Sequence, residues 1–502
     1  MRTRQAITYA TLATGTLAIA FLLHYPSLFE PRWYGDEGIF AAVAQNIRHG
    51  ETLYSGAWDN KPPLIFFTYA AIQSAFGAGI FPLHLVATMS VLFTQIVVMS
   101  IGYRLFGARR SLVAGLLFAL GMGTPLVEGN VAMTETFMIL PASLAVLTYL
   151  LAERRPASER TPWYAAVGVL ISVAAAYKQV AVFDGAAIAM MIWIMHDRPL
   201  RALAPMAAGF AVPQVAFALL FLAAGAFPAY WYAIVGSLGL YAELGSAQSP
   251  FVRFAAFLPS FLAVAWLVRR RQLGRPVRLS MFPMLWLGFA IAGATSSAFP
   301  FPHYLQQAIP ALALVLVADP LGQEAEDVGK IALAVGGVLV AAVVFGQFAL
   351  AYKDRPQLDP VDYYRTFVQH QYGTMSDNDY VLHFDGSVFT VRDIAADIKR
   401  DAAGTTLYTW SELPWLYPDA DVTNPSRYYT SFLGSVIPGA KSEILRDLAA
   451  RPPTYIVISE NTYAPFPELD AFVAARYTQI AVVNDGRLYR LATADGHLPA
   501  HQ

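Results

Sequence analysis

WYGDEGIFAAVAQNIRHGETLYSGAWDNKPPL, residues 33–64, follows directly on a hydrophobic N-terminal segment. It begins with two adjacent acids, Asp36 and Glu37, and ends with a Trp-Asp-Asn-Lys-Pro-Pro run. Between them, apolar residues recur at helical spacing opposite polar ones, which is typical of a helix lying flat on a membrane. The stretch is either a polar connector or a polar site held against a bilayer, and the composition of the whole chain bears on that choice.

The composition indicates a membrane protein that crosses the bilayer many times. The 502 residues are 56% hydrophobic and only 14% charged, whereas soluble domains are about 25% charged. The chain has no cysteine, which excludes disulfide bonds and thiol chemistry. Its first 25 residues contain an apolar run too long for a signal-peptide core and no small-residue cleavage site, so we predict a retained helix.

Apolar runs long enough to cross the hydrocarbon core predict about eleven transmembrane helices. They lie near residues 6–25, 83–103, 111–127, 134–152, 163–177, 180–196, 203–225, 251–268, 281–298, 303–318 and 330–351. Arginine-rich loops at 104–110, 154–160, 198–201 and 269–278 all fall on the side of the N-terminus, which places that side in the cytoplasm. The apolar segment at 62–76 is too short to span and is predicted to lie in the outer interface.

An odd number of spans places the C-terminal residues outside the membrane. We therefore predict a transmembrane domain over residues 1–352, with an external loop at 26–82, and an extracytoplasmic α/β domain over residues 353–502. From residue 355 onward the chain carries 12 Lys and Arg against 18 Asp and Glu, a net charge of −6. Strands are predicted at 406–410, 454–459, 477–483 and 487–492, and helices at 440–450 and 466–476. No glycine-rich phosphate loop follows any of these strands, so we expect no nucleotide site.

Polar side chains gather near the predicted outer ends of the spans. These polar residues are Glu128, Glu135, Lys178, Gln179, Glu243, Arg253, His303 and Tyr304. Each residue of the opening stretch has an ordinary explanation, because acids favour a helix N-terminus, lysines snorkel to the interface and tryptophans form aromatic belts. Ionisable groups at membrane depth are costly and usually functional, however, and these all fall on one face. The opening stretch is therefore predicted to be part of a site.

The motifs in their order resemble the GT-C superfamily of membrane glycosyltransferases. The adjacent acids, DNKPP at 59–63, MTETFMILP at 133–141, YKQ at 177–179 and PHYLQQAIP at 302–310 carry this resemblance over roughly residues 1–350. More narrowly, the chain is similar to the bacterial branch related to protein O-mannosyltransferases and aminoarabinose (lipid A) transferases. It has Asn60-Lys61-Pro62-Pro63 where protein mannosyltransferases have a His-Pro-Pro form, which weakens the inference of a protein acceptor.

The resemblance implies an inverting glycosyltransferase. It would move one monosaccharide from a polyprenyl-phosphate donor to a cell-envelope acceptor, a glycan, lipid or protein, at the outer face of the bacterial plasma (inner) membrane. Its partners would be that donor, the acceptor and the lipid bilayer, with no nucleic acid. Asp36 would be the catalytic base, assisted by Glu37.

The same resemblance implies the remaining site residues. The donor phosphate and sugar would contact Lys61, Trp58, Tyr54, Lys178, Arg253, His303 and Tyr304. A divalent cation, Mg²⁺ or Mn²⁺, would suit the carboxylates and the phosphate, with Glu37 and Glu135 as candidate ligands.

Two other functions compete with this interpretation. A transporter or flippase of an anionic lipid-linked substrate would also place acids and lysines in the membrane, but transporters usually show internal repeats, and none is visible in this sequence. A receptor or scaffold would leave Asp36, Glu37 and Lys61 without a role. Under the transferase hypothesis, the C-terminal domain is expected to form a Rossmann-like layered fold that covers the site and does no chemistry.

Overall fold

The computed structural model describes residues 3–492 except 245–249, 297–298, 300, 319–335, 337–340, 344, 347–349, 353 and 402–403. The chain divides into two compact units, and each is considered by itself. The helical unit comprises Met1–Leu28, His84–Leu219 and Tyr241–Arg365. The mixed unit comprises Phe29–Leu83, Leu220–Leu240 and Thr366–Gln502. The predicted domain boundary at 352/353 stays a prediction, because this division groups the first loop with the C-terminal residues.

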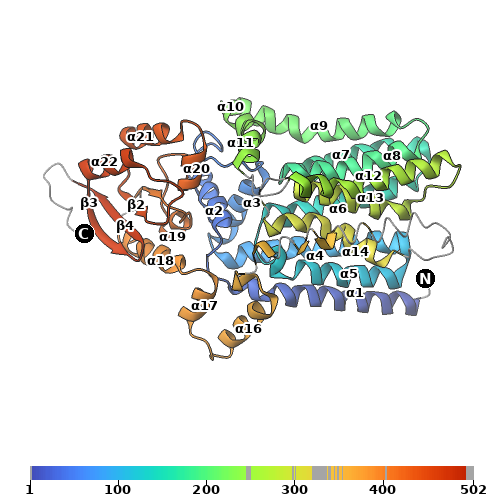
Figure 1. Cartoon of the computed structure of the whole chain (residues 1–502), viewed down its shortest axis with the longest axis horizontal. Coiled ribbons are helices and arrows are strands. Elements are labelled where there is room, and N and C mark those ends of the chain that lie inside the picture. The colour runs from blue at the N-terminus through green and yellow to red at the C-terminus, as the bar shows by residue number, and fades with distance from the viewer. Residues whose placement is uncertain are drawn as a thin grey trace. The chain divides into compact units, whose positions relative to one another are not determined.

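The helical unit is a bundle of long apolar helices (Figure 1). Its α-helices are α1 (Thr3–His24), α4 (Ile80–Phe106), α5 (Ala108–Met122), α6 (Thr134–Glu153), α7 (Thr161–Ala175), α8 (Val182–Met195), α9 (Leu200–Ala223), α12 (Pro250–Gln272), α13 (Phe282–Thr295), α14 (Ile309–Val317) and α16 (Pro360–Gln371). Of these, α4, α9 and α16 continue past the unit's limits. Short 3₁₀ turns connect or extend them: η1 (Tyr25–Phe29), η2 (Pro125–Val127), η3 (Ala157–Glu159), η4 (Gln179–Ala181), η6 (Leu279–Met281), η7 (Pro302–Ala308) and η8 (Pro356–Leu358).

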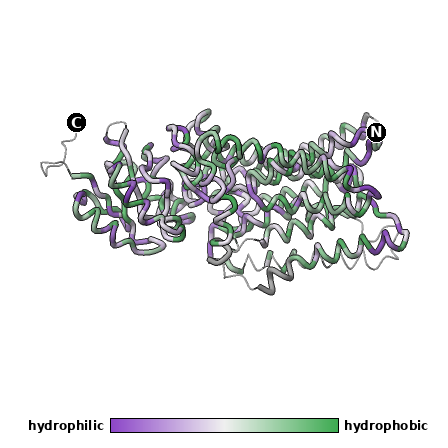
Figure 2. The backbone as a smooth tube through the Cα atoms, turned by 90° about the horizontal axis from the view of Figure 1, so that it is seen from above, coloured by the Kyte–Doolittle hydropathy of each residue, from purple (hydrophilic) through white to green (hydrophobic). Residues whose placement is uncertain are grey.

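These helices coincide with the predicted spans. Each span predicted between residues 6 and 318 overlaps a helix, and most of the last, 330–351, lies outside the described residues. Among the described residues, four helices are long and apolar enough to cross a bilayer: Arg4–Phe29, Ile80–Phe106, Thr134–Glu153 and Leu200–Ala223. Hydrophobic residues run along the whole bundle in Figure 2. The chain is a multi-pass membrane protein, and the number of about eleven spans stays a prediction.

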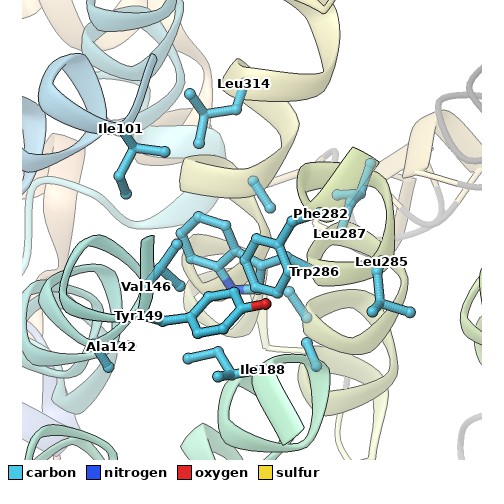
Figure 3. Close-up of a cluster of buried hydrophobic side chains, with 14 of the residues drawn as sticks. Ile101, Ala142, Val146, Tyr149, Ile188, Phe282, Leu285, Trp286, Leu287 and Leu314 are labelled. Atoms are coloured by element: carbon cyan, nitrogen blue, oxygen red, sulfur yellow. The ribbon is translucent and has the colours of Figure 1, made fainter. Parts of the chain in front are cut away.

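Aromatic packing holds the middle of the bundle together (Figure 3). Tyr149 of α6 is fully buried, and its ring lies 5.6 Å from that of Phe282 on α13. Phe282 in turn stacks on Trp286, one helical turn further along α13. Ile188 of α8 belongs to the same buried cluster. Because large rings fill the space between three helices, this core gives the polar helix ends a rigid support.

The mixed unit contains the opening stretch, the short helices after α9 and the C-terminal residues. Its helices are α2 (Gly35–Arg48), α3 (Leu64–Phe76), α10 (Phe227–Trp231), the π-helix η5 (Tyr232–Gly236), α11 (Ser237–Leu244), α17 (Asp377–Phe384), α18 (Ser387–Ile398), α19 (Leu416–Ala420), α20 (Ser431–Val436), α21 (Ala440–Ala450) and α22 (Pro467–Arg476). The helices and strands predicted in the C-terminal domain are confirmed to within one or two residues, whereas α17 to α20 were not predicted.

A four-stranded mixed sheet organises the C-terminal residues, in the order β1-β2-β4-β3. Its strands are β1 (Leu407–Trp410), β2 (Tyr455–Ser459), β3 (Tyr477–Val483) and β4 (Gly486–Leu491). β1 and β2 pair in parallel, whereas β4 is antiparallel to both β2 and β3. Every residue of β1 and β2 is buried, which means that both faces of these strands are covered, as in layered α/β folds.

Arg48 and His49 at the end of α2 are exposed, whereas two polar residues of the same helix are buried, which the sequence did not indicate. Gln45 and Asn46 are at most 1% exposed. The side-chain amide of Gln45 donates to the carbonyl of Val422, and that of Asn46 donates to the carbonyl of Asn424. The C-terminal segment therefore covers Gln45 and Asn46 and satisfies their amides, because buried polar groups need hydrogen-bond partners.

Candidate active site

The two adjacent acids lie in the first turn of α2. The residue before the helix is Tyr34, and no side-chain oxygen caps it, so the acids favour this helix end through its dipole rather than as hydrogen-bonding caps. The side chain of Asp36 is 33% exposed, whereas Glu37 is 1% exposed. Adjacent helical residues point in different directions, so of this pair Asp36 is the one that a dissolved substrate can reach.

A tight loop positions Lys61 against this helix. The Tyr54 N–H donates to the carbonyl of Ala57 at 2.7 Å, and Tyr54 has a positive φ of 70°, which is uncommon for a residue other than glycine. Burial of its ring against Phe66 and Tyr230 offsets this strain. The Tyr54 hydroxyl donates to the backbone carbonyl of Lys61 at 2.9 Å. The strained turn thus holds the Lys61 backbone in place.

Lys61 lies between two carboxylates. Its Nζ is 3.9 Å from Asp36 Oδ2 and 3.4 Å from Asp59 Oδ1, and its side chain is 20% exposed. Asp59 Oδ1 also accepts the Lys61 N–H at 3.1 Å, the pattern of an Asx turn. Nζ lies 5.7 Å from the centroid of the Phe40 ring, close enough for a cation–π contact. These partners aim the ammonium group at the carboxylate of Asp36.

Asp59 belongs to this group. It is part of the DNKPP motif at 59–63, but no role was assigned to it from the sequence. Its side chain is 1% exposed. Within the part of the chain that the structure describes, its Oδ2 has no hydrogen-bond partner. Burial raises the pKa of Asp59, the charge of Asp36 adds to the rise, and Lys61 acts against it. The signal available in the sequence was its position two residues before Lys61, which is typical of a side chain that binds the backbone ahead of it.

The two aromatic residues of the loop are enclosed by protein. Tyr54 is fully buried and Trp58 is 1% exposed. The Trp58 ring lies 6.0 Å from Tyr428 and 6.3 Å from Tyr232. Their contact with a donor sugar stays a prediction, and their observed role is to fix the loop that carries Lys61.

The helical unit holds a second lysine–carboxylate group. Lys178, just before η4, forms an ion pair with Glu135 in the first turn of α6. Glu135 is fully buried and also accepts from the Thr134 hydroxyl at 2.6 Å. The ammonium of Lys178 lies 3.5 Å from the centroid of the Tyr304 ring on η7. Three segments far apart in the sequence therefore meet around one ammonium group.

His303 belongs to the same part of the helical unit. Its Nδ1 lies 2.5 Å from Glu128 Oε2, and its ring stacks on Phe301. The ring of Tyr304 stands perpendicular to that of His303, with centroids 4.7 Å apart. Gln306 donates to the carbonyls of Val127 and Glu128, which ties η7 to η2. The structure thus brings His303, Tyr304, Lys178 and Glu135 together, and their place at the outer membrane face stays a prediction.

Arg253 lies in α12, but its side chain is outside the described part of the chain, and its role stays a prediction. A divalent cation, Mg²⁺ or Mn²⁺, stays a prediction. Among the described residues, no three His, Asp or Glu side chains gather closely enough to hold a metal ion. Between Asp36 and Asp59 the ammonium of Lys61 already supplies the positive charge. Glu37 and Glu135 belong to different units, and their sharing of a metal stays a prediction.

Comparisons with known proteins agree with this fold. Residues 60–231 match the family model described as dolichyl-phosphate-mannose-protein mannosyltransferase. No curated protein matches the chain significantly. The crystal structure of ArnT from Cupriavidus metallidurans bound to undecaprenyl phosphate has 17% identity and a TM-score of 0.58, with 99% of this chain and 100% of that chain covered.

The apo state of the same ArnT gives a similar result. Its identity is 18% and its TM-score 0.59, with 97% of this chain and 98% of that chain covered. Similarity at this level of identity establishes the fold. The chain therefore has the fold of ArnT, and its residues 60–231 resemble the mannosyltransferase family.

Proposed function

We propose that the protein is an inverting glycosyltransferase. It transfers one monosaccharide from a polyprenyl-phosphate donor to a glycan, lipid or protein of the cell envelope, at the outer face of the bacterial plasma membrane. The observation that carries the proposal is the arrangement of Lys61 between Asp36 and Asp59 in a chain with the GT-C fold. A general base and a cation side by side are what sugar transfer from a lipid phosphate requires.

Asp36 acts as the base in this proposal. An acceptor hydroxyl oxygen attacks the anomeric carbon while the bond from that carbon to the phosphate oxygen breaks. The hydroxyl proton passes to the Asp36 carboxylate, and the polyprenyl phosphate leaves with the bonding electron pair. Attack from the side opposite the leaving group inverts the anomeric configuration. The partial exposure of the Asp36 side chain supports this role, since a base must reach the proton that it removes.

Lys61 stabilises the leaving phosphate. Charge grows on the phosphate oxygen as the bond breaks, and a cation held in advance lowers the energy of that state. Asp59 and the Tyr54 hydroxyl hold Lys61, so little reorganisation is needed when the phosphate arrives. Glu37, buried beside Asp36, helps to fix the first turn of α2. No step of this mechanism uses a metal ion.

The group around Lys178 binds the donor in a different way. Lys178 is already paired with Glu135. We therefore assign it, with His303 and Tyr304, to orientation of the donor phosphate and sugar rather than to leaving-group stabilisation. ArnT bound to undecaprenyl phosphate supports a polyprenyl-phosphate donor for a chain of this fold.

Turnover of a defined donor tests the proposal. The purified full-length protein in lipid nanodiscs is mixed with a panel of undecaprenyl-phosphate sugars and an envelope extract as acceptor. We expect one donor to be converted to undecaprenyl phosphate with transfer of its sugar, and the product to have the opposite anomeric configuration by NMR. A transporter or flippase would move the lipid without consuming it, so an unchanged donor pool would reject the transferase.

Alkaline phosphatase fusions test the orientation. A fusion after residue 360 should be active and one within 269–278 inactive, because alkaline phosphatase becomes active only outside the cytoplasm. The reverse pattern would place Asp36 on the wrong side of the membrane for an outer-face reaction.

A further inference from the structure

The loop after β1 presents a carboxylate that the sequence argument did not use. Glu412 is an exposed residue whose Oε1 accepts the Ser431 hydroxyl at 2.5 Å and the Phe432 N–H at 2.7 Å. Two donors on one oxygen fix the direction of this side chain, although it reaches solvent. A carboxylate held in this way is ready to bind a further donor without a large loss of side-chain entropy.

Glu412 lies close to Asp36 because the segment that carries it packs on the first turn of α2. The Trp415 indole N–H donates to the carbonyl of Tyr34 at 2.9 Å. A Cβ added at Gly38 would come within 2.9 Å of both Pro414 and Trp415. The residues just after Glu412 are therefore in direct contact with the residues on both sides of Asp36.

The electrostatics agree with this contact. The surrounding protein raises the pKa of Glu412 by desolvation, and the charge of Asp36 raises it further. The Ser431 hydroxyl and the Phe432 N–H act in the opposite direction, because they stabilise the charged form. The charge of Asp36 therefore acts on Glu412, in agreement with the packing of the two segments.

An exposed aromatic ring adjoins Glu412. The Tyr463 N–H donates to the Ser431 hydroxyl oxygen at 2.8 Å, and the rings of Tyr463 and Phe432 stand perpendicular with centroids 4.9 Å apart. Tyr463 is 54% exposed. A carboxylate that accepts hydroxyl hydrogen bonds beside an aromatic ring that packs on C–H groups is a combination suited to a sugar.

We propose that Glu412, with Tyr463, binds the acceptor next to Asp36, so that the C-terminal domain supplies part of the acceptor site. The inference rests on the proposed transferase function. Charge distinguishes the two substrates, because a carboxylate attracts hydroxyl donors and repels a phosphate. The anionic donor lies with Lys61, and the hydroxyl-bearing acceptor lies with Glu412.

The test separates acceptor binding from donor binding. Wild type, Glu412→Gln and Tyr463→Ala are compared in nanodiscs, with Glu468→Gln as control because Glu468 is an exposed glutamate of the same domain. Transfer is measured against increasing envelope extract at saturating donor, and undecaprenyl phosphate binding is measured separately. Glutamine keeps an oxygen for Ser431 and Phe432, and the melting temperature of each variant verifies folding.

We expect Glu412→Gln to raise the KM for acceptor about tenfold or more, the effect of losing a hydrogen bond to a charged group. Undecaprenyl phosphate binding should stay within about twofold of wild type, a difference of about 0.4 kcal/mol, and the control should behave as wild type. An unchanged KM for acceptor in both site variants, or loss of undecaprenyl phosphate binding in Glu412→Gln, would overturn the assignment. If wild type itself consumes no donor, the transferase function fails and the acceptor site fails with it.

Discussion

Lys61 of the mixed unit and Lys178 of the helical unit are both paired with carboxylates, but they are held differently. Lys61 lies 3.4 Å and 3.9 Å from two carboxylates and is 20% exposed. Lys178 is in close contact with a fully buried glutamate, and its side chain is 13% exposed. A tight pair with a buried acid serves mainly to neutralise that acid, whereas a looser and more exposed lysine is available to a ligand. We therefore expect substitution of Lys178 to reduce stability more than substitution of Lys61 does, and substitution of Lys61 to weaken donor binding.

The largest expected effect on the transfer rate comes from substitution of Asp36, one of the two carboxylates next to Lys61. Asp36→Asn keeps the size of the side chain and removes the base, so transfer should fall about 10²- to 10⁴-fold. The measurement is the initial rate of donor consumption by purified protein in nanodiscs. Asp470→Asn, an exposed position in α22, is the matched control and should keep wild-type activity. A loss of less than threefold in Asp36→Asn would exclude it as the base.

The two lysines themselves give the next largest effect. Lys178→Ala leaves Glu135 buried without its cation, and loss of one partner of a buried pair costs about 3–5 kcal/mol of stability. Lys61→Ala should destabilise less, because Asp59, whose pKa burial already raises, can take up a proton, but it should raise the donor KM about tenfold or more, because a hydrogen bond to a charged phosphate is lost. Thermal unfolding and donor titration are measured on both variants.

A double variant sharpens this contrast. Lys178→Met combined with Glu135→Leu replaces the ion pair by apolar groups and should be more stable than Lys178→Ala alone, because no charge is left buried. Equal stability of the two lysine variants would show that the pairs are alike and would remove the distinction between them.

A smaller effect is expected where α2 packs on the C-terminal segment. Gly38→Val would push a side chain into Pro414 and Trp415, and overpacking of this kind costs about 1–3 kcal/mol. Gly35→Ala is the control, since nothing lies within 4 Å of its added Cβ. Thermal unfolding measures both, and a Gly38→Val protein as stable as Gly35→Ala would mean that the contact is loose.

The same packing changes how a truncation should be interpreted. Removing residues 356–502 would strip α2 of the partners of Gln45 and Asn46. Loss of activity in such a protein would report damage to the Asp36 site as well as loss of the domain, so point substitutions are the cleaner test.

The smallest effect is the pH dependence from Asp59. Its pKa is raised in the folded protein, so the folded state binds this proton more tightly than the unfolded state does. The stability from the protonated form is present at low pH and is lost as the pH rises through the folded pKa. Asp59→Asn should therefore gain in melting temperature relative to wild type as the pH rises from about 4, the ordinary pKa of Asp, through the raised pKa of the folded state, by about 2–4 °C per kcal/mol. Glu468→Gln should show no such trend, and a relative gain toward low pH would contradict the sign.

Local patterns in the sequence were enough for the secondary structure and for part of the site. The predicted spans overlap helices because burial in lipid demands about 20 apolar residues in a row, which composition reveals. The strands at 454–459 and 477–483 were recognised because β-branched and aromatic residues favour extended chain. The proximity of His303, Tyr304 and Lys178 followed from placing them at the same membrane face.

These local patterns could not predict contacts between residues that are hundreds of positions apart in the sequence. Gln45 and Val422 are 377 residues apart, and no periodicity indicates that one will bond the other. Gln45 resembled a water-facing residue because the sequence shows polarity but not what covers it. Glu412 resembled an ordinary loop acid for the same reason.

By itself, the sequence indicated a chain that crosses a membrane many times and the strands and helices between residues 406 and 492, because these properties depend on local hydrophobicity and spacing. It also pointed to Asp36 and Lys61, since charged residues near a bilayer are costly. Only the tertiary structure decided which charges meet: Lys61 with Asp36 and Asp59, and Lys178 with Glu135. Electrostatic interactions depend on distance and burial in space, and packing of remote segments sets both.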